Sequence, residues 1–410
     1  MASIRKRFLK DGTVAWQVDY KDLKGKRRHK QFNKRHKADE WLVRARAEIA
    51  EGTHVAARDT ITFKQAGESW IANCRRRRLE ETTIISYQQH LDDHLYPLWQ
   101  DKKLNELTNV VTQTLYEDLL EGDRTLDMVR RVRIDAGAVL NYAKSKGWVG
   151  KNVIYETPFE FSKRGSKRPE MPTMEEGQRM IVLTVQAWQD WLAFVLVLVF
   201  CGLRASEVRA LSWTDVDFAS DTITVLRRAD RWGRIGQPKS AAGTRTIPIP
   251  QAVRDALIAW KPRCPSSELN LVFPSSRGTV QNQSNIMNRF FRLMQVEAGI
   301  YIEVVKLDKD GRKIVRKRAK YGLHALRHFC ASLWIEANYS AKRVQSYMGH
   351  ASIVQTYDTY GYLFDLRDND KEALKRVEVR VMNGVIGPQE THQEKRPANP
   401  VAGGKQAAQK

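Results

Sequence analysis

The feature that most restricts the fold of this chain is one continuous apolar run. It extends from Trp191 to Leu203 and is thirteen residues long. A membrane-spanning helix needs about 18 apolar residues or more, so the run is too short to cross a bilayer. We therefore predict a helix buried inside a protein core. The hydrophobic content of 42% is enough for such a core, and 410 residues suggest two or three domains.

The charge of the chain indicates a polyanionic partner. Lys and Arg number 69 and Asp and Glu number 47, which gives a formal net charge of +22. The calculated pI is about 9.8. A protein this basic usually binds nucleic acid. The alternative is a basic surface that is only solvated.

The cysteines argue against zinc and against a disulfide framework. Cys74, Cys201, Cys264 and Cys330 lie far apart, and none forms a C-x-x-C pair. We expect reduced thiols in a cytoplasmic protein. The basic N-terminus is not followed by an apolar segment, so we expect no secretory signal.

The first fifty residues predict a small module of three strands and a helix. Residues 14–20 alternate apolar and polar side chains, which is typical of a strand, and a third strand is expected near 28–32. Trp41, Ala45 and Ile49 then recur every four residues, as on one face of a helix. The strands are rich in Lys and Arg. Because a DNA major groove admits a β-ribbon, we favour a DNA-binding sheet over a merely solvated one.

Three further regions follow. From 62 to about 152 the apolar residues keep helical spacing, which predicts a bundle of four or five helices. Residues 153–172 are basic and contain prolines, so we expect an extended linker. Thr173 and Glu176 have the spacing of a helix-capping box. Beyond it we expect helices, a small sheet or hairpin formed by 221–227 and 244–249, a basic hairpin or insertion of unknown role at 304–318, and helices again.

Two segments carry residue types that suit a phosphate. Arg204 and Glu207 lie in CGLRASEVRAL, just after the apolar run. His324 and Arg327 are three residues apart, so they share one face of any helix that contains both. Arginine offers planar, permanently charged donors, and the carboxylate can orient them. By itself, Arg204 is better explained by a structural ion pair at a helix start.

A nucleophile follows the second segment. His350 comes after Gly349, and the sequence T-Y-D-T-Y-G-Y-L then offers Tyr357, Tyr360 and Tyr362. A phenol has a pKa near 10 and becomes a nucleophile only when nearby cations or a base favour its oxyanion. Neither pair of histidines has acidic or cysteine partners at metal-ligand spacing, so we predict no metal and no cofactor.

The words G-L-R-x-x-E-x-x-x-L, H-x-x-R, G-H and the following tyrosine, in this order, resemble the tyrosine recombinase (phage integrase) family. The resemblance covers about residues 1–375 and is strongest over 201–211 and 321–362. It implies an α+β multidomain fold: a small N-terminal β-sheet-plus-helix domain, an all-α core-binding bundle, and a mainly α catalytic domain with a small antiparallel sheet. The expected ranges are 1–55 for an arm-type DNA-binding domain, 60–155 for the core-binding domain, 170–378 for the catalytic domain and 379–410 for a disordered tail.

The resemblance also assigns roles. It implies a catalytic set of Arg204, Lys239, His324, Arg327, His350 and Tyr360, with Glu207 in support. Lys239 is the only lysine in the loop between the two strand-like stretches and would protonate the leaving oxygen. Members with the same T-x-D-x-Y-G ending use the tyrosine before the glycine, which favours Tyr360; Tyr357 and Tyr362 stay as alternatives. We expect a structural role for His328 and at most an accessory phosphate contact for Arg245.

The implied activity is site-specific recombination without metal or ATP. Tyr360 would form a 3′-phosphotyrosyl bond, and the protein would integrate, and in the reverse direction excise, a phage or mobile element. The partners implied are double-stranded DNA attachment sites, three further copies in a homotetramer, a host DNA-bending protein and an excisionase, with no membrane. Such a protein would act in the cytoplasm of a bacterial host, on the nucleoid. The alternatives are a type IB topoisomerase and a non-enzymatic DNA-binding protein.

Overall fold

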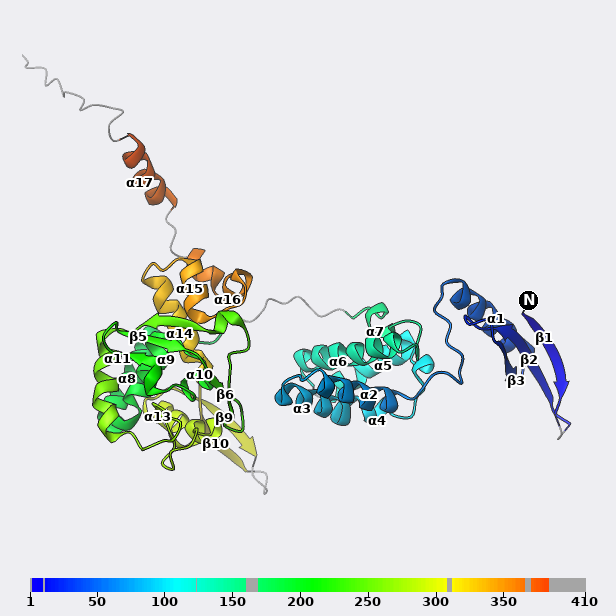
Figure 1. Cartoon of the computed structure of the whole chain (residues 1–410), viewed down its shortest axis with the longest axis horizontal. Helices are drawn as coiled ribbons and strands as arrows, with labels where there is room; N and C mark the ends of the chain where they lie inside the picture. Colours follow the sequence, from blue (N-terminus) through cyan, green and yellow to red (C-terminus); the bar gives the residue numbers. More distant parts are fainter. Residues whose placement is uncertain are drawn as a thin grey trace, which may run out of the picture. The chain divides into compact units, whose positions relative to one another are not determined.

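The structure is a computed structural model and describes residues 2–9, 12–122, 124–159, 169–307, 312–365 and 370–382. The chain divides into two compact units, Met1–Ser166 and Lys167–Lys410. Figure 1 shows the helices and strands of each unit. Each unit is described by itself below.

Unit 1 begins with the predicted strand module. Three antiparallel strands pair in the order β1-β2-β3 and are followed by one helix. Their bounds are β1 (Ser3–Phe8), β2 (Val14–Lys21), β3 (Arg27–Phe32) and α1 (Arg35–Ala50). The helix packs Ala38 and Leu42 on Val18 of β2, which makes a small core. The prediction for residues 1–50 is confirmed, although Leu42 rather than Trp41 is the buried residue.

The rest of unit 1 is a helical bundle. Its elements are α2 (Phe63–Arg76), α3 (Glu81–His90), the π-helical turn η1 (Leu91–Leu95), α4 (Tyr96–Trp99), η2 (Leu104–Glu106), α5 (Asn109–Glu121), α6 (Leu126–Ser145) and α7 (Val153–Glu156). The π turn ends two residues before Pro97, which has no N–H to continue an α-helical ladder. The helices bury their apolar faces in one core that includes Phe63, Trp99, Leu115 and Val139. The predicted bundle is therefore confirmed.

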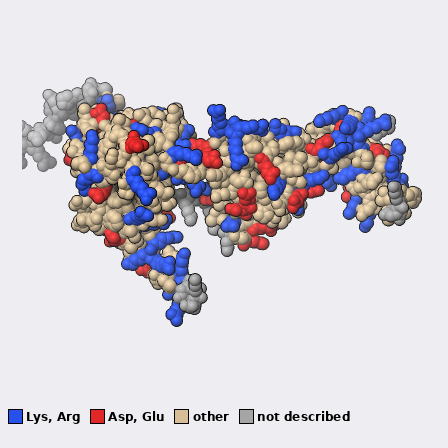
Figure 2. Space-filling model, turned by 60° about the horizontal axis from the view of Figure 1, so that its bottom comes forward, with Lys and Arg blue, Asp and Glu red and all other residues tan. Residues whose placement is uncertain are grey.

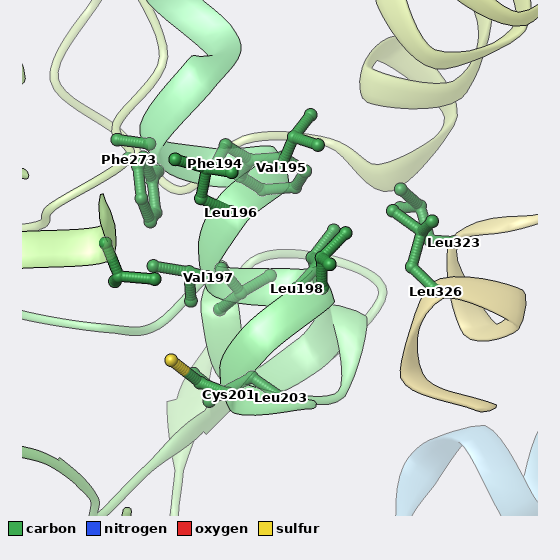
Figure 3. Close-up of a cluster of buried hydrophobic side chains, with 14 of the residues drawn as sticks. Phe194, Val195, Leu196, Val197, Leu198, Cys201, Leu203, Phe273, Leu323 and Leu326 are labelled. Atoms are coloured by element: carbon green, nitrogen blue, oxygen red, sulfur yellow. The ribbon is translucent and has the colours of Figure 1, made fainter. Parts of the chain in front are cut away.

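Unit 2 is built around the apolar run. The run forms α9 (Leu192–Cys201), a helix with buried residues on all of its faces. Figure 3 shows its side chains beside Phe273, Leu323 and Leu326. A helix that is apolar all round must be covered by other elements. The prediction of a buried core helix is confirmed.

Unit 2 has further helices, several of which contact α9. They are α8 (Met174–Ala187), η3 (Gln189–Trp191), α10 (Ala205–Val208), η4 (Trp213–Asp215), η5 (Ala241–Gly243), α11 (Gln251–Trp260), η6 (Lys261–Arg263), α12 (Gln283–Ile286), η7 (Met287–Phe291), α13 (Arg292–Glu297), α14 (Leu323–Glu336), α15 (Ala341–Met348), α16 (Ile353–Asp365) and α17 (Asp370–Met382). Among them, α8, α10, α11 and α14 contact α9. The predicted capping box at the start of α8 is present, because Thr173 and Glu176 each accept a hydrogen bond from the other's backbone N–H.

Three small antiparallel sheets complete unit 2. Their strands are β4 (Val216–Asp217), β5 (Thr222–Val225), β6 (Arg228–Ala229), β7 (Ile235–Gly236), β8 (Arg245–Pro248), β9 (Tyr301–Leu307) and β10 (Lys313–Ala319). They pair as β4-β5-β8, β6-β7 and β9-β10. Pairing of β5 with β8 confirms the predicted small sheet. The β6-β7 hairpin inside its connecting loop was not predicted.

Two boundaries differ from the sequence-based predictions. The segment expected to be an extended linker from 153 begins instead with α7, because Val153 and Ile154 fit into the bundle core. At the other end, α17 continues to Met382, so 379–382 are helical; the rest of the predicted tail, 383–410, lies outside the described residues. Within the described part of the chain, no helix is both long and apolar enough to span a membrane.

Candidate active site

The predicted site residues come from five places in unit 2. Glu207 lies in α10 and Arg204 is its N-cap residue. His324 and Arg327 lie in α14, His350 follows α15, and Tyr360 lies in α16. Lys239 lies in the loop between β7 and η5, just before β8.

A buried carboxylate joins two of the arginines. Glu207 receives hydrogen bonds from Arg204 at 2.7 Å and from Arg245 at 2.8 Å. The side chains of Glu207 and Arg245 are 3% and 4% exposed, whereas that of Arg204 is 33% exposed. Burial would raise the pKa of Glu207, but Arg245, Arg327 and Arg204 outweigh it and lower that pKa to about 2. Glu207 is therefore a permanent anion that holds the guanidinium of Arg204, which still reaches the solvent.

Carbonyl oxygens at the ends of two helices accept further hydrogen bonds from Arg327 and Arg204. Gly202, at the end of α9, and Gly349, at the end of α15, both have left-handed backbones, with φ of +59° and +61°. A left-handed glycine commonly ends a helix. Arg327 donates to the carbonyl oxygens of Gly202 and Met348, and Arg204 donates to that of Gly349. The carboxyl ends of two helices are thus fixed beside two arginines, where cations are favourable.

The tyrosine predicted as the nucleophile points into this region. Tyr360 is 1% exposed, and its Oη lies 2.8 Å from Nδ1 of His328. Its ring stacks on that of His350, with centroids 6.4 Å apart. His350 Nδ1 in turn lies 2.9 Å from Thr356 Oγ1. Tyr357, the alternative nucleophile, is 53% exposed and has a ring contact with Phe364 instead.

The histidines of the site are neutral at pH 7. Burial, followed by the charges of nearby residues, lowers the pKa of His328 to about 4 and that of His350 to about 3. Loss of solvation and the charges of Arg327 and Arg204 also lower the pKa of His324. Burial raises the pKa of Tyr360, although Arg327 and Arg204 act in the opposite direction. In this state the phenol keeps its proton, and a neutral imidazole lies next to it.

The loop with Lys239 lies against the same helix end. A Cβ at Gly349 would be 2.8 Å from the carbonyl oxygen of Ala242, three residues after Lys239. Arg245 at the start of β8 donates to the carbonyl oxygens of Gly243 and Tyr347. The end of this loop next to β8 is therefore fixed against α15. Lys239, three residues before Ala242, is an exposed residue of the same loop.

Two residues of the site make contacts that the sequence did not predict. His328, expected to be structural, is the direct partner of the Tyr360 phenol. Arg245, expected to be at most accessory, is buried and binds both oxygens of Glu207. Helical spacing was an available signal for His328, because it is four residues after His324 and their rings are in contact, with centroids 4.6 Å apart. No sequence pattern pointed to the Arg245–Glu207 pair, which joins residues 38 positions apart.

Among the residues that the structure describes, no group of three His, Cys, Asp or Glu side chains is placed to hold a metal ion. The site is instead a cluster of arginines, neutral histidines and a phenol. Cationic donors of this kind can stabilise charge on a phosphate directly.

Two family profiles and several curated proteins match the chain. The profile of the Phage integrase family matches residues 184–365, and that of the Phage integrase N-terminal SAM-like domain matches 62–120. The tyrosine recombinase XerC-like protein of Caldanaerobacter subterraneus subsp. tengcongensis is 23% identical over 341 residues, which are 77% of this chain and 82% of that protein.

Solved structures share the fold. The Tn1549 transposon integrase in complex with transposon right end DNA is similar with a TM-score of 0.61 and 17% identity, covering 78% of this chain and all of that one. The lambda integrase tetramer bound to a Holliday junction has a TM-score of 0.54 and 16% identity, covering 86% and 94%. The two family profiles, together with the recombinase relatives, show that the chain belongs to the phage integrase family of tyrosine recombinases.

Proposed function

We propose that this recombinase cuts and rejoins DNA at specific sites through a covalent bond between Tyr360 and a 3′-phosphate. The observation that carries the proposal is the placement of the Tyr360 phenol among His328, His350 and the arginines that Glu207 organises. Arg204 and Arg327 would neutralise the phosphate, with His324 and His350 as further hydrogen-bond partners.

Residues of this site can accept the proton that the nucleophile releases and supply the proton that the leaving oxygen takes up. Oη of Tyr360 attacks the phosphorus in line, and its proton passes to Nδ1 of His328, which lies 2.8 Å away. The P–O5′ bond breaks, and the leaving oxygen takes a proton from Lys239. The phosphotyrosyl bond keeps the energy of the phosphodiester, so a 5′-hydroxyl from a partner strand reverses the step without ATP.

The assembly and the biological setting are part of the same proposal. Exchange between two duplexes needs four active subunits, and lambda integrase, which shares the fold, is a tetramer on a Holliday junction in its structure. We propose that this chain forms a homotetramer on paired attachment sites and integrates a phage or mobile element in the cytoplasm of a bacterial host. In unit 1, β1–β3 would bind arm-type DNA, with a host bending protein and an excisionase as accessory factors.

We also propose a separate role in DNA binding or catalysis for each domain. The segment 60–155 would grip the core site, and 170–378 would carry out the chemistry. Figure 2 shows many Lys and Arg side chains on the visible surface, which is suited to the phosphates of DNA. The run Arg75–Arg78, where α2 ends, supplies part of this charge.

Covalent trapping tests the nucleophile. A pool of nicked duplexes with a randomised centre is incubated with the protein in EDTA, and protein-linked DNA is recovered under denaturing conditions. We expect adducts with wild type and with Tyr357→Phe, and none with Tyr360→Phe. Adducts with Tyr360→Phe would move the nucleophile to another tyrosine. Tight DNA binding with no adduct from any of the three proteins would contradict the covalent mechanism.

A further inference from the structure

The β9–β10 hairpin has no part in the site described above. Both of its seven-residue strands are paired along their whole length, from Tyr301 opposite Ala319 to Leu307 opposite Lys313. In Figure 1 the hairpin projects from the rest of unit 2. A two-stranded ribbon by itself is marginally stable in water, so a ribbon of this length is expected to have a partner.

The charge of the strands identifies the chemistry of that partner. The two strands carry five cations and a single carboxylate, Glu303. All five cations are exposed: Lys306, Lys313, Arg316, Lys317 and Arg318. One carboxylate can neutralise at most one of them. Figure 2 shows the Lys and Arg side chains gathered on the projecting lobe.

The pairing register distributes these cations over both faces. Side chains alternate between the faces of a strand, and directly opposed residues share a face. Arg316 and Arg318 therefore lie on one face together with Lys306, while Lys313 and Lys317 lie on the other. Exposed aliphatic residues also occur on both faces, with Ile314 on the first face and Val315 on the second.

We propose that the β9–β10 hairpin is a DNA-binding ribbon that enters a groove of the duplex beside the phosphate held at the active site. A protein partner covering one face would leave the other face charged and exposed. A DNA groove has phosphates on both of its walls, so it matches a ribbon that is basic on both faces. The major groove admits a two-stranded β-ribbon, and aliphatic side chains can contact thymine methyl groups there.

The root of the ribbon is rigid, which fixes the direction in which it projects. The buried amide of Gln295 donates to the carbonyl oxygen of Tyr321 at 2.9 Å and accepts from its N–H at 2.8 Å. The hydroxyl of Tyr321 and Nζ of Lys320 both donate to Glu176 of α8, at 2.7 and 2.8 Å. Strand β10 is thus tied to α8 and α13 immediately beyond its last residue.

The same root connects the ribbon to the site. Only four residues separate Ala319, the end of β10, from His324 on α14. Seven residues at about 3.4 Å each give the ribbon a reach of about 24 Å, or about seven base pairs. The position beside the cleaved phosphate rests on the proposed function of the active site, whereas the affinity of the ribbon for duplex DNA does not.

Salt-dependent binding tests the ribbon independently of catalysis. The full chain and its Lys313→Gln/Arg316→Gln/Lys317→Gln/Arg318→Gln variant are titrated with a mixed-sequence 40-base-pair duplex at several salt concentrations. Each phosphate contact that is lost should reduce the slope of log K against log salt by about 0.9, and we expect binding at least about tenfold weaker. The control is Arg254→Gln/Arg263→Gln, which neutralises cations that make ion pairs elsewhere in unit 2 and should change the slope little.

Cross-linking identifies what the ribbon touches. Val315 is 55% exposed, and Val305 opposite it is 58% exposed, so a photoreactive p-benzoylphenylalanine in place of Val315 faces outward. We expect it to cross-link to the radiolabelled duplex. A cross-link to a second copy of the chain only, or an unchanged salt slope in the fourfold variant, would overturn the proposal. Covalent capture by the fourfold variant at saturating concentration reports on the active site separately, because a fault there abolishes adducts without changing the salt slope.

Discussion

The phenol Oη of Tyr360 and Nδ1 of His328 are 2.8 Å apart, and they join α16 to α14 inside a buried cluster. A buried hydroxyl that loses its partner destabilises a protein by about 1–3 kcal/mol. The pair is therefore important for the stability of the fold as well as for the proposed chemistry.

A double-mutant cycle separates these two roles. We expect His328→Phe to lower the free energy of unfolding by about 1–3 kcal/mol, because it leaves the Tyr360 hydroxyl unpaired. Tyr360→Phe should cost less in the His328→Phe background than in wild type, since the unpaired hydroxyl is then gone. Urea denaturation of the four proteins measures this coupling. Strict additivity would show that the hydrogen bond contributes nothing to stability.

Removal of Glu207 should be among the most destabilising changes in the site. Glu207→Ala leaves Arg245, whose side chain is 4% exposed, without its carboxylate. Breaking a buried ion pair in this way typically costs about 3–5 kcal/mol. The control is Asp190→Asn, which breaks an exposed ion pair with Arg263 and should cost under about 1 kcal/mol. Thermal or urea unfolding compares the two, and equal losses would contradict the prediction.

Gly349 should be needed for both its backbone and its lack of a side chain. Gly349→Ala is strained at φ +61°, and its Cβ would also lie 2.8 Å from the carbonyl oxygen of Ala242 and 3.1 Å from Arg245. We expect it to displace the loop that carries Lys239, with adduct formation falling more than DNA binding. Gly147→Ala is the matched control, because Gly147 also has a positive φ, +72°, but has open space around it.

The control should lose only the strain energy, about 1 kcal/mol. Covalent capture and DNA titration on both variants measure the difference. If Gly147→Ala and Gly349→Ala lose adduct formation equally, close packing at Gly349 has no special role.

Stability should fall in mild acid, and His350 should contribute a measurable part of the loss beside His328 and His324, whose pKa values are also lowered. Its pKa in the folded protein is about 3, below the ordinary value of 6.5, since burial and Arg327, Arg204, Arg245 and His328 disfavour its cation. The stabilisation is therefore complete above pH 6.5 and is lost as the pH falls, because the unfolded chain then binds a proton that the folded chain does not.

The linked loss is at most about 1.4 kcal/mol for each pH unit below 6.5, or about 2 kcal/mol at pH 5. In His350→Gln this contribution is absent, so its stability should fall less between pH 7 and pH 5. Glu207 does not obscure the comparison, because its lowered pKa affects stability only below about pH 4.5. Urea denaturation at pH 7, 6 and 5 measures both proteins, and parallel pH profiles would count against the assignment.

Periodicity predicted the elements well where one physical rule controls the structure. The α9 helix follows from a long apolar run, β2 from alternation, and the start of α8 from a capping box. Local patterns could not predict contacts between distant segments. Arg245 meets Glu207 only because β8 lies against α10 and α15, and nothing near Arg245 in the sequence indicates this.

The same limit applied to the histidines. The spacing of His324 and Arg327 placed them on one helix, as the structure confirms. Which imidazole faces the tyrosine depends on how α16 crosses α14, and that crossing follows from side-chain packing in the cluster around Tyr360. The helix period therefore identified a short list of candidates, and only the fold shows that His328 contacts the phenol.

Main-chain oxygens, rather than side chains, position Arg327. It donates to the carbonyl oxygens of Gly202 and Met348 at the ends of α9 and α15. A carbonyl group is present whatever residue occupies the position, so most substitutions along these two helices leave the acceptors of Arg327 in place. The position of the Arg327 guanidinium thus depends on the backbone at these two helix ends, and most strongly on Gly202 and Gly349, whose left-handed φ angles turn the chain there.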